Sequence, residues 1–365
     1  MANKNITMRI LDDDGAYDKL YPQTSATQSE VSADTQQLFG QSDVNTCLDK
    51  LADTISTLGR VVIKVVDANN NPIEGAVITG ISGQNITDAQ GGASGILTTN
   101  PITVKSPYVD LQDMTVDASK YAGSFNTLTI TLPIVGENSI RRFTTSQPVK
   151  FSKMTKTVDV CCVGGGGGGT VDNHWPLTGG GWSGGQGCGG GGGAIVNGYG
   201  LSITALTSYP VVIGNGAIVV ISDPSIKGQG GTTSFLTVSA QGGYSGYFER
   251  VETTTSYYYN AHSGTAGATG CGDGGGGSNT TISEFNDGKT FYSGGGGNGF
   301  QNGGSPNGAN GVSYSASYPY YPVNATAAGI GGGGGGGGGT IIDGDMRTAN
   351  GSAGGNGLVA IRFHF

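Results

Sequence analysis

Residues 331–339 read GGGGGGGGG, the longest of several glycine runs in this chain of 365 residues. The other runs are Gly164–Gly169, Gly189–Gly193, Gly274–Gly277 and Gly294–Gly297. Of the 71 glycines, 60 follow position 162, so the glycine content is ordinary before that point and very high after it. These runs therefore decide the fold of the C-terminal part.

Glycine-rich chain is ordinarily a flexible linker, because glycine loses the most backbone freedom on folding and buries no side chain. Here, however, the runs alternate with segments rich in strand-forming residues, and aromatic residues are frequent between them. The strand-like segments are Val158–Val163, Tyr209–Ile213, Ala217–Ile221, Phe235–Val238 and Leu358–Phe365. We expect an ordered domain, and the lack of a strict Gly-X-Y period excludes a collagen helix.

Polyglycine II is the ordered structure that such runs can adopt. It has three residues per turn, a rise of about 3.1 Å and no internal hydrogen bonds, so its amides need partners on neighbouring chains. Without Cβ atoms, several such helices can approach and bond to one another. In this geometry Gly331–Gly339 would span roughly 28 Å and Gly164–Gly169 roughly 19 Å. We expect a block of these helices with loops gathered at its ends, although some runs can instead be turns.

The chain is expected to be mainly β and modular, with three parts. Residues 1–59 form an attachment segment and an oligomerisation helix, residues 60–135 a small β-sandwich, and residues 136–365 the glycine-rich domain. Strands around Arg141–Thr144 and Val149–Phe151 open the last domain, and we expect Leu358–Phe365 to pair with them and frame it.

The first part contains a predicted hairpin and a predicted helix. Alternating residues in Ile6–Leu11, followed by Asp-Asp-Asp-Gly and Tyr17–Pro22, are typical of a short hairpin. Residues 43–58 place Val44, Leu48 and Leu51 on one face, after a capping Ser42 or Asp43 and before Gly59. An isolated helix of this length is marginal in water. The apolar face therefore indicates packing in its own domain or, as we slightly prefer, against two sister chains.

The second part has short strands at regular spacing. Val61–Val66 is a predicted strand, residues 67–72 (DANNNP) a turn, and Gly75–Gly80 the returning strand. Ile102–Val104 and Thr127–Leu132 are later strands, and about seven in all are typical of a small sandwich. The pattern "NPIEGAVITG" (71–80) with "ITDAQG" (86–91) resembles transthyretin-like or carboxypeptidase-regulatory-like modules. That resemblance implies a spacer or adhesive unit.

Composition excludes several classes of protein. The net charge is −8 and only 12% of residues are charged, which argues against nucleic acid as a partner. No apolar stretch is long enough for a transmembrane span, and no signal-peptide core follows Met1. We therefore expect that the protein is made in the cytoplasm and does not insert into a membrane. The five cysteines are an odd number that includes the adjacent pair Cys161 and Cys162, which indicates buried free thiols, and we expect no metal and no cofactor.

No catalytic motif is found, and we expect that the protein is not an enzyme. The glycine runs lack the G-K-[ST] ending of a P-loop, and no G-x-S-x-G sequence occurs. Acidic residues that could pair for glycan hydrolysis exist, but their spacing distinguishes none of them. They are Asp172, Glu249, Glu252, Asp273, Asp287, Asp343 and Asp345.

Aromatic clusters between the glycine runs are the candidate binding residues. Tyrosine and tryptophan give rigid contact area with a polar group, and mixed with Asn, Ser, Thr and Gly they suit a sugar. The alternative is that these rings merely cover a scaffold that has no side-chain core. The candidates are Trp175, Trp182, Tyr244, Tyr247, Tyr257, Tyr258, Tyr259, Tyr292, Phe300, Tyr314, Tyr318, Tyr320 and Tyr321.

Two sequence patterns resemble phage proteins. Residues 5–28 (NITMRILDDDGAYDKLYPQTSATQ) look like the start of tail-fibre and baseplate-attached proteins of phages and prophages of Gram-positive bacteria. The order "YPVVIGNGA" (209–217), "GGTTSFLTVSAQGG" (230–243) and "GLVAIRF" (357–363) resembles the glycine-rich domain at the ends of phage tail fibres. The polyglycine arrangement is similar to the tip adhesins of T-even-like long tail fibres, although those lack this chain's attachment segment and spacer.

The resemblance implies a receptor-binding protein, a tail fibre or adhesin, of a phage or phage-tail-like particle. Its partners would be a bacterial surface glycan or protein and the baseplate or tail proteins. We expect a homotrimer, located in the virion or tail-like particle. The alternatives are a structural tail component without receptor contact and a glycan depolymerase.

Overall fold

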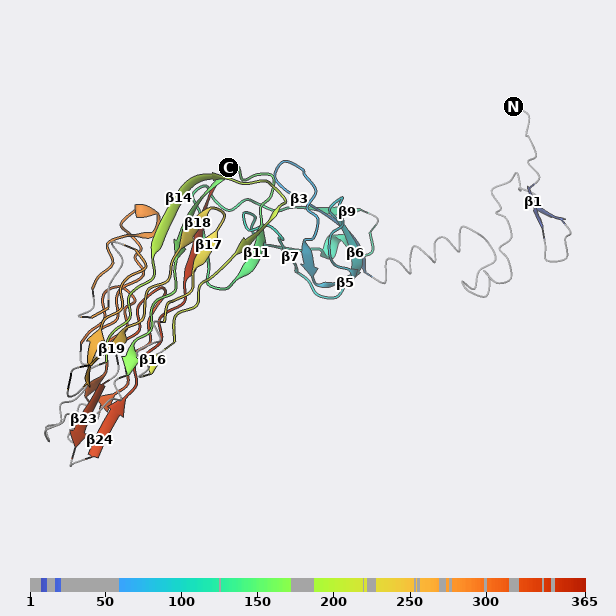
Figure 1. Ribbon diagram of the computed structural model, residues 1–365. Coiled ribbons are helices and arrows are strands. Elements are labelled where there is room, and N and C mark those ends of the chain that lie inside the picture. The colour runs from blue at the N-terminus through green and yellow to red at the C-terminus, as the bar shows by residue number, and fades with distance from the viewer. Residues whose placement is uncertain are drawn as a thin grey trace. The chain divides into compact units, whose positions relative to one another are not determined.

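The structure is a computed structural model, and it describes residues 8–11, 17–20, 59–124, 126–171, 187–218, 220–221, 228–252, 254, 257–268, 274–275, 278–298, 301–314, 322–336, 338–342 and 345–365 (Figure 1). These residues divide into two compact units. The first comprises residues up to Pro107 together with Leu111–Ile134, and the second comprises Tyr108–Asp110 and Val135–Phe365.

The expected mainly-β, modular fold is confirmed. In the described part of the chain, the helical segments are the 3-10 turns η1 (Ser119–Tyr121) and η2 (Glu284–Asn286). The helix predicted over residues 43–58 lies outside the described residues. The predicted N-terminal hairpin is present, since β1 (Met8–Leu11) pairs with β2 (Tyr17–Leu20) in an antiparallel register.

Besides the β1–β2 hairpin, the first unit contains two sheets formed by the seven strands β3 to β9. Their bounds are β3 Arg60–Val66, β4 Val77–Thr79, β5 Ile81–Gln84, β6 Gly92–Leu97, β7 Ile102–Lys105, β8 Met114–Val116 and β9 Thr127–Thr131. One sheet has the order β5-β6-β3-β9 and the other β4-β7-β8. Alternate residues of both sheets are buried, among them Ile63, Val65, Ile78 and Val104. This alternation is what two sheets need to bury one face each.

One predicted pairing in this unit is wrong. Residues 75–80 do not return beside β3, because β4 pairs with β7 in the other sheet. The partners of β3 are β6, antiparallel, and β9, parallel. The turn after β3 is tightened instead by Asp67, whose carboxylate accepts the amides of Asn69 and Asn71 at 2.9 Å.

A four-stranded sheet frames the second unit. Its order is β10-β25-β12-β14, and the strands are β10 Ile140–Phe143, β12 Thr157–Val163, β14 Ile195–Ser202 and β25 Leu358–His364. The predicted pairing of the opening strand with the closing strand is therefore confirmed for β10 and β25. The other opening strand, β11 (Gln147–Lys150), pairs with β15 (Ser208–Val211) instead.

Each face of this sheet carries a separate apolar cluster. Cys162 lies in the cluster that contains Phe151, Phe235 and Phe363, and Cys161 lies in the cluster that contains Phe285. Adjacent strand residues point to opposite faces. Cys161, Cys162 and Cys188 are buried thiols that form no disulfide with a described residue, as predicted.

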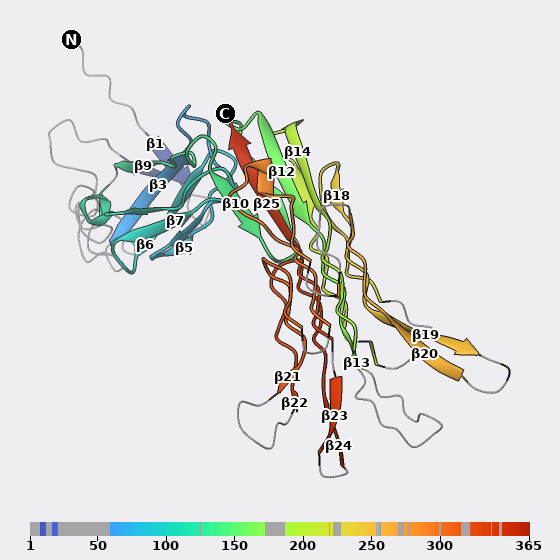
Figure 2. The same cartoon turned by 90° about the vertical axis from the view of Figure 1, so that its left-hand side faces the viewer.

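Beyond the sheet the chain continues as long extended segments that lie side by side (Figures 1 and 2). Gly164–Gly169, which follows β12, is the central one, and its amides bond with a period of three. Gly164 and Gly167 donate to Ala194 and Gly191 at 2.9 and 2.8 Å. Gly166 and Gly169 donate to Gly355 and Ser352 at 2.8 and 2.9 Å. This is the pattern of a polyglycine II bundle, and we call each such segment a rod.

Six rods surround the central rod and bond to it: 189–194, 331–336, 352–357, 214–218, 228–231 and 241–246. In this order each is also bonded to the next. The bonds are Gly190 to Gly334, Ser352 to Gly335, Gly354 to Ala217, Gly231 to Asn215, Gly230 to Gly243 and Gly191 to Tyr244. The central rod is therefore enclosed, and its residues are buried.

The central rod requires glycine because its neighbours leave no space for Cβ atoms. A Cβ on Gly166 would clash with the carbonyl of Gly332, and one on Gly167 with the carbonyl of Tyr244. A Cβ on Gly168 would clash with the carbonyl of Ile218. Close backbone approach, rather than a special φ angle, explains these glycines.

Three sequence predictions in this unit need correction. The run 331–339 is not one rod, because Gly338 and Gly339 belong to strand β23 (Gly338–Ile342). Residues 217–221 are not one strand, because Ala217 lies in a rod and only Val220–Ile221 forms β16. Residues 235–238 form a turn between β17 (Thr233–Phe235) and β18 (Val238–Ala240), with Leu236 at a φ of 52°.

Outer rods show which positions tolerate side chains. Along rod 214–218 and the residues before it, Val212, Asn215 and Ile218 are exposed. The same spacing of three separates exposed residues on the other outer rods. They are Gln229 and Thr232, Gln241 and Tyr244, and Asn350, Ala353 and Asn356. One residue per turn faces solvent, so a side chain at every third position marks an outer rod.

Candidate functional site

The rods end in four pairs of strands at the end of the bundle opposite the framing sheet (Figure 2). These pairs are β13 (Thr170–Val171) with β16, β19 (Tyr247–Glu252) with β20 (Tyr257–His262), β21 (Ser313–Tyr314) with β22 (Pro322–Val323), and β23 with β24 (Asp345–Ala349). We call this end the distal end. β13 follows the central rod after Gly169, β19 follows rod 241–246 and β23 follows rod 331–336, so rods that run side by side place the pairs at the same end of the bundle.

Several predicted binding residues belong to these pairs. Tyr247 and Tyr257–Tyr259 lie on β19 and β20, and Tyr314 lies on β21. The backbone register places Tyr259 opposite Arg250 and Tyr257 opposite Glu252. β22 also lies next to β23 and β24. The distal end therefore collects tyrosines from distant parts of the sequence.

Other candidates lie outside the described residues. They are Trp175, Trp182, Phe300, Tyr318, Tyr320 and Tyr321. In sequence, Trp175 and Trp182 follow β13, and the three tyrosines lie between β21 and β22.

At the distal end, three residues at the base of the β19–β20 hairpin make contacts through their side chains. Tyr247 stacks on His262, with ring centroids 4.7 Å apart and an interplanar angle of 12°. The Nε2 atom of His262 lies 3.0 Å from the Glu249 carboxylate. The Glu249 and His262 side chains are 58% and 37% exposed, so both are accessible to a partner. Sequence reasoning missed His262, although the antiparallel register of two tyrosine-rich segments would have placed it opposite Tyr247.

Two tyrosine candidates lie elsewhere. Tyr244 is on an outer rod and 42% exposed. Tyr292 is buried at 6% exposure in the apolar cluster with Phe285, and its hydroxyl lies 3.3 Å from Glu284. Burial raises the pKa of Tyr292 to about 12, as does the nearby Glu284 carboxylate. The surroundings of Tyr292 are those of a core residue.

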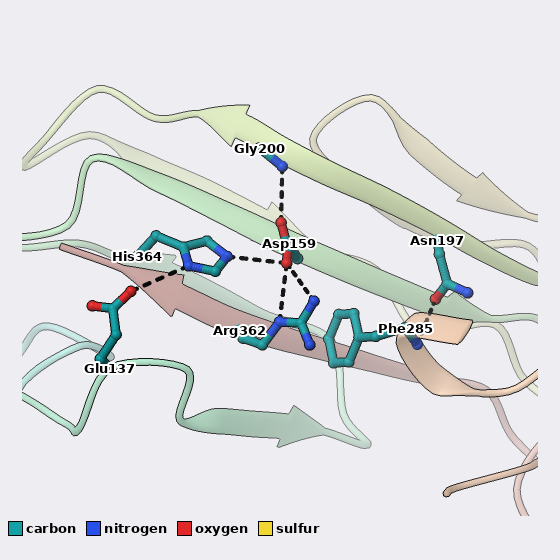
Figure 3. A network of polar contacts seen from close by, with 7 residues as sticks. All are labelled: Glu137, Asp159, Asn197, Gly200, Phe285, Arg362 and His364. Carbon is teal, nitrogen blue, oxygen red and sulfur yellow. Dashed lines mark hydrogen bonds and ion pairs between the residues drawn. The ribbon is translucent and has the colours of Figure 1, made fainter. Parts of the chain in front are cut away.

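The framing sheet carries a polar network of its own (Figure 3). The Asp159 carboxylate accepts from Arg362 Nε and Nη2 at 2.9 and 2.6 Å, and from the Gly200 amide at 2.8 Å. His364 bridges two carboxylates, with Nε2 3.0 Å from Asp159 and Nδ1 3.3 Å from Glu137. These contacts join β12 to its neighbours β14 and β25.

Hydrogen bonds to the Asp159 carboxylate dominate this network. Burial acts to raise the pKa of Asp159, but the Gly200 amide, Arg362 and His364 outweigh it and hold the pKa below its ordinary value. Arg362 also lies over the Phe285 ring at 4.5 Å. The network is thus a clamp across three strands, and its charges are used within the fold.

Glu284 forms a second buried ion pair near this sheet. The carboxylate is 2% exposed and accepts from Arg142 Nη2 at 2.9 Å. Among the described residues, its Oε1 atom finds no hydrogen-bond partner. The hydrogen bond to Glu284 raises the pKa of the Arg142 guanidinium.

Two kinds of feature are absent from the described residues. No group of three or more His, Cys, Asp or Glu side chains there is arranged to hold a metal ion. No described helix is long and apolar enough to cross a membrane.

Comparison with known proteins gives one match. Residues 143–364 match the family model of the glycine-rich domain. The match begins at the last residue of β10 and extends through β25, so it includes β12, β14 and β25 of the framing sheet, the rods and the distal pairs. No curated protein matches the chain.

Proposed function

This chain belongs to the glycine-rich domain family, and on that premise we propose that it is a receptor-binding protein, a tail fibre or adhesin, of a phage or phage-tail-like particle. The glycine-rich unit would contact the bacterial surface. Residues 1–59 would attach the chain to baseplate or tail proteins, and its copies would form a homotrimer. The phage assignment rests on the resemblance of residues 5–28 and of the C-terminal sequence order.

One observation supports the distal end as the contact surface. All four strand pairs lie there, and they carry Tyr247 and Tyr257–Tyr259 together with Tyr314. Tyrosine presents a large rigid surface with little loss of side-chain entropy, which suits recognition of a glycan or a protein. The enclosed rods hold these pairs on a rigid support. Weak contacts at each tip would be multiplied by the several copies on one particle.

The test is binding of the full-length chain, fluorescently labelled, to a panel of Gram-positive cells and to wall polysaccharide extracted from them. We expect saturable binding to some strains. The distal variant Tyr247→Ala/His262→Ala should weaken it about tenfold or more. The matched control is Tyr199→Ala, because Tyr199 is 48% exposed but lies on β14 of the framing sheet.

Each outcome is informative. Equal binding by the distal and control variants would exclude a contact at the β19–β20 base. Absence of binding to every strain would favour a structural tail component instead. Release of oligosaccharide from the polysaccharide, lost on Glu249→Gln, would favour a depolymerase.

A further inference from the structure

The outer rods carry backbone donors without partners. On rod 214–218 the amides of Gly214, Gly216 and Ala217 donate hydrogen bonds to described residues, whereas those of Asn215 and Ile218, three residues apart, do not. Ala217 donates to Gly166 and Gly231 to Asn215, both at 2.8 Å or less. The amides of Asn215, Ile218 and Thr232 donate no hydrogen bond to another described residue.

These free amides form an edge like that of an open β-sheet. Unpaired N–H and C=O groups in a row are a template for another chain. The partner that fits the row is a further glycine rod, because rods within this block already bond to one another in the same way. The glycine-rich unit of a second copy of the chain would supply such a rod.

The side chains on this edge prevent that approach. Asn215, Ile218 and Thr232 are exposed, and Ile218 reaches 79% exposure. In the interior, a Cβ at Gly165 or Gly168 would clash with a neighbouring carbonyl. A Cβ at the outer positions excludes an approaching rod by the same geometry. No charged residue lies in 212–218 or 228–232, so charge does not supply this exclusion.

We propose that the outer face of rod 214–218, together with the adjoining Thr232, is a docking edge for the glycine rods of a second copy, closed by the side chains of Asn215, Ile218 and Thr232. The closure keeps the glycine-rich units of neighbouring copies apart. It acts on the glycine-rich fold itself, so it does not depend on the proposed function.

The test compares two triple variants of the full-length chain. Asn215→Gly/Ile218→Gly/Thr232→Gly removes the side chains together with their Cβ atoms. Asn215→Ala/Ile218→Ala/Thr232→Ala shortens the same side chains but keeps their Cβ atoms. None of the three side chains makes a hydrogen bond to a described residue, so neither variant breaks one. Sedimentation equilibrium should show that the mass of the glycine variant rises about twofold or more over the wild type with concentration. The alanine variant should keep the wild-type mass.

Amide hydrogen exchange gives an independent readout. The amides at positions 215, 218 and 232 should become protected in the associated glycine variant and stay unprotected in the alanine variant. A folded glycine variant with the wild-type mass would overturn the proposal, and so would equal association of both variants. Protection of the Gly164–Gly169 amides reports that the variants are folded. If the triple glycine variant unfolds, the single pair Ile218→Gly and Ile218→Ala makes the same comparison.

Discussion

The amide of Gly166 donates to the carbonyl of Gly355 at 2.8 Å, although most of the sequence of the glycine-rich unit lies between the two residues. Hydrogen bonds of this kind, between residues far apart in the sequence, hold the rods of the glycine-rich unit together. The central rod forms such bonds to every surrounding rod, and each depends on the absence of Cβ atoms.

Replacement of a central glycine should therefore destabilise the unit strongly. In Gly167→Ala the new Cβ would clash with the Tyr244 carbonyl, which is backbone and cannot rotate away. We expect a loss of about 3 kcal/mol in the free energy of unfolding, as for severe overpacking. Urea unfolding measures it. Asn215→Ala, at an outward position, is the control and should change stability by less than about 1 kcal/mol.

The period of three can be tested by insertion. One glycine added after Gly166 would turn Gly167–Gly169 toward the wrong neighbours, and each misdirected buried amide costs about 1–3 kcal/mol. Three added glycines restore the directions and displace only the strand pair beyond. Thermal unfolding should show a much lower midpoint for the single insertion than for the triple one. The opposite order would refute the three-fold arrangement.

Acid should weaken the clamp at Asp159. Because its pKa is lowered in the folded protein, its stabilisation is present above the ordinary value of 3.8 and is lost as pH falls through the folded pKa. Asp159→Asn should cost about 2 kcal/mol near neutral pH, since Arg362 then lacks its charged partner. Urea unfolding at several pH values should show this difference shrinking below about pH 4.

Removal of Arg142 should leave a buried charge unpaired. Arg142→Leu should destabilise by about 3 kcal/mol, because Glu284 then has neither its ion pair nor water. The double variant Arg142→Leu/Glu284→Leu should recover part of this loss. A double-mutant cycle from urea unfolding measures the coupling, and additive effects would mean that the two residues do not interact.

The adjacent thiols Cys161 and Cys162 should be unreactive in the folded protein. Burial raises the pKa of Cys162 to about 12 and also raises that of Cys161, so neither thiol ionises near neutral pH. Iodoacetamide followed by mass spectrometry should label both only after denaturation. Labelling of the native protein at either position would show that the framing sheet opens.

Strand content was predictable because it is a local property. Val158–Val163 has the apolar run of a buried strand, and the structure places β12 there. The rods were predictable as a type, because a glycine run has few ordered alternatives. Their bounds were not, since Gly338 joins a strand through pairing with Ala349, a contact that the run itself does not encode.

The order of the rods could not be predicted, because one glycine run resembles another and the partners are distant. A signal was nevertheless present. The spacing of Gln241 and Tyr244 and the spacing of Asn350, Ala353 and Asn356 both mark outer rods. An apolar segment such as Ala217–Ile221 looks like a strand unless Val212, Asn215 and Ile218 are seen to follow the same period.

The enclosed rod has a consequence for inheritance. Rods recognise one another through backbone atoms, so two related genes that exchange DNA within their glycine codons would rejoin segments that still pack. An exchange on both sides of β19–β20, β21–β22 or β23–β24 would carry that complete antiparallel pair from one distal end to another. We expect such genes to diversify by swapping whole distal hairpins while the glycine segments between them stay interchangeable.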